Sequence, residues 1–159
     1  MTMQQIREWL FIGKYAETRR LDYLQGSGIN AMLQLADYVA QPDIETLYLA
    51  VEDGVSLYHP RIKKGVTFVR EQKALGKRIL IACGAGQSRS VTFGIAALME
   101  EEGLELFDAY REIYIRHRGA EPHHELILSL TDYYGKPMEL LEVWEKLHEV
   151  RKLVNQAGV

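Results

Sequence analysis

The sequence has little cysteine and no long apolar run. It contains a single cysteine among 159 residues, so it cannot form an internal disulfide, and this is typical of proteins in a reducing compartment. No apolar stretch approaches the roughly 20 residues that a membrane-spanning helix requires. Residues 1–10 include polar and charged residues where a signal peptide would have its apolar core. We therefore expect a cytoplasmic protein with no membrane partner.

The sequence also lacks an excess of basic residues. Its 19 Lys and Arg oppose 22 Asp and Glu, which leaves a formal net charge of -3. Proteins that bind nucleic acid through their general charge are basic, so we expect no nucleic-acid partner. The composition is 47% hydrophobic and 26% charged, as in ordinary globular proteins, and the length predicts a single domain over residues 1–159.

Short apolar runs alternate with segments of helical periodicity in the first two-thirds of the chain, and helices follow. Strands are predicted over residues 9–13, 29–35, 46–51 and 78–82. Helices are predicted over residues 18–24, 60–75, 91–102, 105–118, 122–130 and 138–154. This order predicts an α/β fold with a central, mostly parallel sheet of four to five strands, flanked by helices, with an extra helix at the C-terminal end.

The most informative stretch is a loop rich in small residues between the strand 78–82 and the helix 91–102. Five residues separate Cys83 from Arg89 in this loop. Small residues allow the backbone to curl so that several N–H groups point inward, and the following helix adds the positive end of its dipole. The pattern predicts a cradle for a phosphate dianion. Its expected substrate-binding residues are Gly84, Ala85, Gly86, Gln87, Ser88 and Arg89.

Residues around this loop have the chemistry of phosphoryl transfer. A cradle that binds an anion also stabilises a thiolate, so Cys83 is the expected nucleophile. The planar guanidinium of Arg89 can bind two phosphate oxygens, and Ser90 can donate a hydrogen bond to the sulfur. Asp53 follows a predicted strand at the same sheet edge and is the candidate general acid. Glu52 competes for that role, but strand alternation would point it the other way.

These residues resemble a known family. The Cys83-x5-Arg89-Ser90 pattern after an apolar strand is similar to the signature of the cysteine phosphatases. Other segments resemble the dual-specificity phosphatase family, particularly its smaller prokaryotic members; they are residues 9–13, 28–36, 51–53, 96–99 and 116–130, within a resemblance over residues 6–133.

The resemblance implies a protein tyrosine phosphatase-like fold and a metal-independent reaction without a cofactor. The implied substrates are phosphorylated proteins, with phosphotyrosine first and phosphoserine and phosphothreonine as further candidates. Cys83 would form a phosphocysteine, Arg89 would bind the phosphate, Asp53 would act as acid and then as base, and Ser90 would be the partner of the thiolate.

Two positions depart from the family pattern. Ala82 stands where the family has a histidine that braces the loop and tunes the thiol, and Gly119 stands where proline is common. The loop also contains no lysine, which phosphoinositide phosphatases commonly carry there, so a lipid substrate is disfavoured.

Four other readings are compatible with parts of the sequence. A dinucleotide-binding module would share the Gly84-x-Gly86 spacing, but Arg89 occupies its third glycine position. A catalytically weak phosphate-binding adaptor is favoured only by Ala82, and a rhodanese-like sulfurtransferase would not need an upstream acid. His123 and His124 suggest a metal site, but neighbours on a helix point about 100° apart, so we assign no metal ligand.

Overall fold

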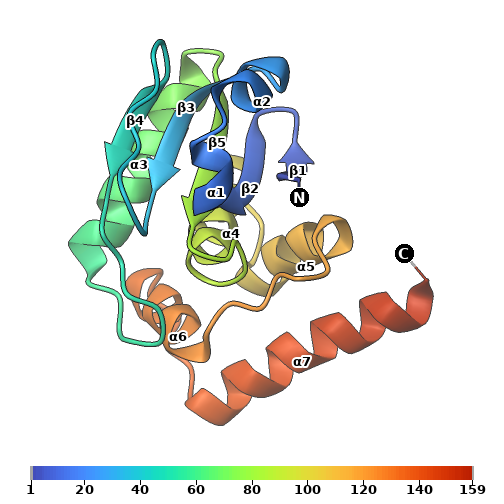
Figure 1. Ribbon diagram of the computed structural model, residues 1–159. Helices are drawn as coiled ribbons and strands as arrows, with labels where there is room; N and C mark the ends of the chain where they lie inside the picture. Colours follow the sequence, from blue (N-terminus) through green and yellow to red (C-terminus); the bar gives the residue numbers. More distant parts are fainter. Residues whose placement is uncertain (1, 159) are drawn as a thin grey trace.

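The computed structural model describes residues 2–158 and contains a five-stranded sheet (Figure 1). In spatial order the strands are β1 (Gln4–Arg7), β2 (Leu10–Lys14), β5 (Arg78–Cys83), β3 (Ile29–Gln34) and β4 (Glu45–Tyr48). The pairings of β2 with β5, β5 with β3 and β3 with β4 are parallel, whereas β1 is antiparallel to β2. The predicted fold class, with its largely parallel sheet, is confirmed.

Seven helices are formed within residues 2–158. They are α1 (Tyr15–Thr18), α2 (Leu21–Gly26), α3 (His59–Ala74), α4 (Arg89–Glu102), α5 (Leu106–Arg116), α6 (His124–Tyr133) and α7 (Leu140–Ala157). Helices α1 and α2 pack on one face of the sheet, and α3 and α4 pack on the other, with α5 and α6 against α4 (Figure 1). Over the same residues, no helix has both the length and the apolarity needed to cross a bilayer.

Strand β5 and helix α4 form the centre of the molecule. Ile79, Leu80 and Ile81 are completely buried because β5 has neighbours on both sides and helices on both faces. Helix α4 is buried on most sides and ends at Gly103, which has the positive φ of 67° that favours glycine. The predicted strand and helix are confirmed, and together they place Cys83 at the carboxyl edge of the sheet.

Three regions differ from the sequence-based expectation. The single helix expected over residues 18–24 is replaced by two short helices, α1 and α2, and α1 was not predicted. Strand β1 was not predicted, because only Ile6 among its four residues is apolar and buried, which leaves no pattern to detect. The strand expected over residues 46–51 ends early, at Tyr48. The chain nevertheless continues beside β3, since the N–H of Leu49 donates to the oxygen of Gln34 at 2.9 Å and that of Val51 donates to Leu35 at 3.0 Å.

The C-terminal helix α7 is present as predicted and packs against α5 and α6 (Figure 1). Val143, Leu147 and Val154 recur at helical spacing and form its buried face. On the side away from the core, Leu141 and Trp144 are exposed.

Candidate active site

The sulfur of Cys83 lies at the junction of β5 and α4. The side chain is buried, with only 3% of the residue exposed. The main-chain N–H of Ser90 donates to Sγ at 3.4 Å, and Oγ of Ser90 lies 3.2 Å from Sγ in a second hydrogen bond. Both contacts come from the first turn of α4, so the sulfur sits at the positive end of a buried helix, where a thiolate is stabilised.

Residues 83–89, which we call the signature loop, curl around this end of α4. Gly86 adopts a φ of 71°, and a Cβ atom at this position would lie 2.9 Å from the main-chain oxygen of Gly13 in β2. Only glycine satisfies both conditions. Within residues 2–158, no atom accepts a hydrogen bond from the main-chain N–H groups of residues 84–89. Six successive N–H groups are therefore available to an anion.

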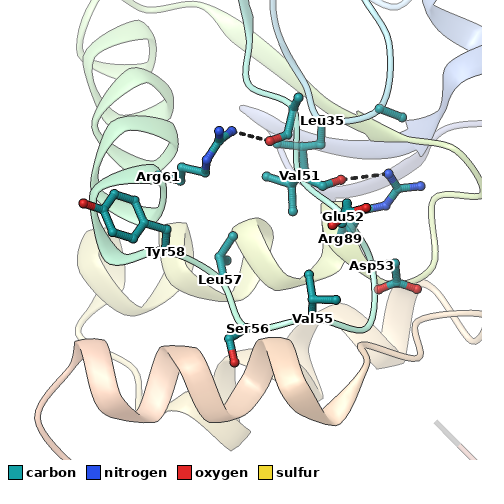
Figure 2. Close-up of a pocket in the computed structure, with 12 residues that line it drawn as sticks. Leu35, Val51, Glu52, Asp53, Val55, Ser56, Leu57, Tyr58, Arg61 and Arg89 are labelled. Carbon is teal, nitrogen blue, oxygen red and sulfur yellow. Dashed lines mark hydrogen bonds between the residues drawn. The ribbon is translucent and has the colours of Figure 1, made fainter.

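Arg89 connects the signature loop with the loop that follows β4. Its Nη1 donates to the oxygen of Val51 at 3.0 Å (Figure 2). A Cβ atom on Gly84 would lie 3.0 Å from Nη2, so the guanidinium lies directly against the signature loop. The remaining N–H groups of the fork can bind phosphate oxygens from this position.

Asp53 contacts the signature loop through one of its serines. Its Oδ1 accepts a 2.6 Å hydrogen bond from Oγ of Ser88. The structure thus brings Asp53 to the same edge of the sheet as Cys83. The sequence analysis preferred Asp53 to Glu52 because of strand alternation, and that argument is wrong. Strand β4 has already ended at these positions, and both residues lie exposed in a loop.

A pocket of about 660 Å³ opens beside the signature loop (Figure 2). Its wall is formed mainly by the segment after β4 and by the first turn of α3, where Arg61 donates to the oxygen of Ala50. Asp53 and Arg89 both line this pocket, whereas Cys83 does not. The pocket therefore borders Arg89 and Asp53 rather than surrounding the sulfur, and it can receive the part of a ligand adjoining the phosphate.

Sequence reasoning placed residues 116–130 within the family resemblance but gave no role to the segment that supports the signature loop from outside. Residues 117–123, the α5–α6 loop, contact three successive residues of the signature loop: Gly86, Gln87 and Ser88. Two of these contacts use main-chain N–H groups of the α5–α6 loop. Almost any residue supplies such a group, so the sequence gives no indication of these contacts. The third uses His117, and no spacing or motif in the sequence distinguishes this histidine from a surface residue.

The histidine pair considered as a metal site has a structural explanation. His123 is the N-cap of α6, and its Nδ1 accepts the N–H of Glu125 at 3.1 Å. The rings of His123 and His124 have centroids 4.2 Å apart, and their planes are tilted by 34°. In the part of the chain that the structure describes, no three His, Cys, Asp or Glu residues are grouped so as to hold a metal ion.

The fold and the loop have known counterparts. A parallel sheet with a Cys-x5-Arg loop between its central strand and a buried helix is the arrangement of the cysteine phosphatase class. Residues 10–136 match the family model described as dual specificity phosphatase, catalytic domain. The chain therefore belongs to the dual specificity phosphatase family.

Individual relatives are similar over most of the chain. Human dual specificity protein phosphatase 16 is 29% identical over 132 residues, which is 80% of this chain but only 20% of that protein. Dual specificity protein phosphatase 1B from Arabidopsis thaliana is 28% identical over 138 residues, 82% of this chain and 81% of the relative. The crystal structure of the human tyrosine phosphatase-like serine/threonine/tyrosine-interacting protein superposes with a TM-score of 0.76 at 26% identity, covering 83% of this chain and 95% of that one.

Proposed function

We propose that the protein is a cysteine-dependent phosphatase that removes phosphate from protein side chains. Phosphotyrosine is the first proposed substrate, with phosphoserine and phosphothreonine as further candidates within the family. One observation carries the proposal: Sγ of Cys83 accepts a main-chain N–H at the start of α4, within a loop whose N–H groups are uncommitted. A reducing compartment such as the cytoplasm is the proposed location, because the single cysteine must remain a thiol.

Binding is the first step of the proposed reaction. The N–H groups of residues 84–89 and the guanidinium of Arg89 would surround three phosphate oxygens and leave the fourth, the ester oxygen, pointing outward. The phosphorus then lies above Sγ of Cys83. In-line attack by the thiolate forms the S–P bond while the P–O bond to the leaving group breaks, and Asp53 donates its proton to that oxygen.

Hydrolysis of the phosphocysteine is the second step. Asp53, now a carboxylate, accepts a proton from a water molecule, and the resulting hydroxide oxygen attacks phosphorus. The S–P bond breaks, inorganic phosphate is released, and the electron pair returns to sulfur. Ser90 would stabilise the departing thiolate, since its main-chain N–H already donates to Sγ and its hydroxyl lies within hydrogen-bond distance.

An aryl-phosphate assay in the presence of EDTA tests the proposal. Wild type should hydrolyse p-nitrophenyl phosphate, and Cys83→Ser should have no measurable turnover while still binding inorganic phosphate. Activity that survives Cys83→Ser, or that EDTA abolishes, would contradict the proposed chemistry. Phosphopeptides that differ only in carrying phosphotyrosine, phosphoserine or phosphothreonine then rank the substrates. A protein that binds these peptides with no turnover at all would instead be an adaptor.

A further inference from the structure

The α5–α6 loop lies along the outer side of the signature loop and makes contacts at three successive positions. Nε2 of His117 lies 2.7 Å from the oxygen of Gly86. The N–H of Glu121 donates to the oxygen of Gln87 at 2.8 Å, and the N–H of His123 donates to Oγ of Ser88 at 2.8 Å. His117 is thus the one residue of this group that acts through its side chain.

The proton in the His117 contact can be assigned from chemistry alone. A carbonyl oxygen accepts but never donates, so Nε2 must carry the proton and donate to Gly86. The ring is half-buried and packs over Gly119, where a Cβ atom would lie 3.1 Å from Cε1 of His117. Gly119, which stands where the family commonly has proline, therefore leaves room for the imidazole in this orientation.

Holding a carbonyl fixes the N–H on the other side of the same peptide. All peptide bonds in residues 2–158 are trans, and in a planar trans peptide the C=O and N–H groups point in opposite directions. When His117 holds the oxygen of Gly86 on the outer side, the N–H of Gln87 turns toward the concave side of the loop. The N–H of Glu121 acts in the same way on the next peptide and turns the N–H of Ser88 inward.

We propose that His117 is a positioning residue that orients the Gly86–Gln87 peptide so that its N–H binds the phosphate. This inference rests on the proposed phosphatase function. It assigns His117 no contact with the substrate. Without the imidazole, the Gly86 carbonyl loses its partner, and the peptide of this conformationally permissive glycine can rotate away from the binding orientation.

Phosphate binding in a Cys83→Ser background provides a readout that does not depend on turnover. His117→Ala should weaken the affinity for inorganic phosphate about tenfold, the effect of losing one hydrogen bond. His117→Gln carries an Nε2 donor on a side chain of similar length and should stay within about threefold of the parent. His148→Ala removes an exposed histidine on α7 and should change nothing. Isothermal titration calorimetry gives the three affinities, and circular dichroism confirms the fold.

A second variant serves if His117→Ala does not fold. Gly119→Ala keeps the imidazole but pushes it by a few tenths of an ångström, and a two- to threefold loss of phosphate affinity is expected. The inference is overturned if His117→Ala or Gly119→Ala binds phosphate like the parent, or if Gln is as poor as Ala at position 117. Failure of the proposed phosphatase function would give a different result from failure of the His117 inference. The Cys83→Ser parent would then bind no phosphate, and wild type would have no turnover.

Discussion

Oγ of Ser88 donates a 2.6 Å hydrogen bond to Oδ1 of Asp53 and accepts one of 2.8 Å from the main-chain N–H of His123. One hydroxyl thereby joins the signature loop, the loop after β4 and the start of α6. Because Asp53 is exposed and lies beyond the end of β4, this contact is what holds its carboxyl group next to the signature loop.

Ser88→Ala should therefore impair the general acid selectively. We expect kcat to fall about tenfold for phenyl phosphate and much less for p-nitrophenyl phosphate, because a good leaving group needs little protonation in the transition state. Asp53→Asn should show the same pattern with a larger loss. The measurement is kcat over a series of aryl phosphates of graded leaving-group pKa. Ser27→Ala, a serine at the end of α2, serves as the control. Equal losses across the series would mean that Asp53 has only a structural role.

Arg89→Lys should be nearly as damaging as Arg89→Ala, with both lowering kcat/KM by at least about a hundredfold. A lysine keeps the charge but cannot hold the Val51 carbonyl and two phosphate oxygens at once, as the planar fork can. Steady-state kinetics on p-nitrophenyl phosphate make the comparison. A lysine variant with most of the wild-type rate would show that position 89 needs only a positive charge.

The C-terminal helix α7 should influence catalysis although it lies beyond the family match, which ends at residue 136. From α7, Arg151 donates to the hydroxyl of Tyr110 at 3.1 Å, and that hydroxyl donates to the oxygen of Ala120 at 2.7 Å. Arg118 also donates to Asn155 at 2.7 Å. Burial raises the pKa of Tyr110 to about 12, so its hydroxyl stays protonated in any ordinary assay.

Arg151→Ala and Asn155→Ala should therefore each lower kcat/KM for aryl phosphates by about two- to fivefold. Arg151→Ala removes the hydrogen bond to Tyr110, whose hydroxyl holds Ala120 of the α5–α6 loop. Asn155→Ala removes the hydrogen bond from Arg118 of that loop and a second one to Tyr114 on α5. Lys152→Ala, a neighbouring exposed residue on the same helix, should behave like wild type. Faster amide hydrogen exchange over residues 117–123 in the first two variants would locate the effect. Unchanged kinetics and hydrogen exchange would mean that α7 only covers the core and does not influence catalysis.

Stability should depend on pH through an ion pair that ties β1 to the helices. Arg7 donates to Glu102 through Nε and Nη2, both at 2.8 Å, and to Glu112 at 2.9 Å. The hydrogen bonds from Arg7 lower the pKa of Glu102 below its ordinary value. A carboxyl group whose pKa is lower in the folded state than in the unfolded state stabilises the folded protein at pH values above the unfolded-state pKa. This stabilisation is lost as the pH falls through the folded-state pKa.

Arg7→Met should accordingly reduce the free energy of unfolding by about 1 kcal/mol at pH 7 and by less below roughly pH 4. Urea unfolding of wild type and variant at pH 7 and below roughly pH 4 measures the change in the free energy of unfolding. Lys152→Met, which removes the same charge, is the control. A loss that is the same at both pH values would assign the effect of Arg7 to packing rather than to the ion pair.

The sequence predicted those parts of the site that depend on neighbouring residues. Cys83, Arg89 and the two glycines between them are close in the chain, and a strand, a curled loop and a helix follow from local composition. Asp53 was reached by resemblance and by the assumption of parallel strands, which is correct, although its placement depends on a loop. His117 could not be found, because its partner is a main-chain oxygen 31 residues away. Strand β1 was missed for a similar reason: it forms because it pairs with β2, and its own composition does not indicate a strand.

The main-chain contacts of the α5–α6 loop have a consequence for how this protein can vary during evolution. At positions 121 and 123 the signature loop is held by N–H groups, which nineteen of the twenty amino acids supply. For this support, selection at both positions therefore acts against one residue, proline. The side chain at position 121 is otherwise free to vary, whereas the side chain at position 123 also caps α6. A saturation library would record position 121 as tolerant apart from proline, and position 123 as tolerant of other residues that can cap α6. The support of the active loop can thus persist in homologues whose sequences show no trace of it.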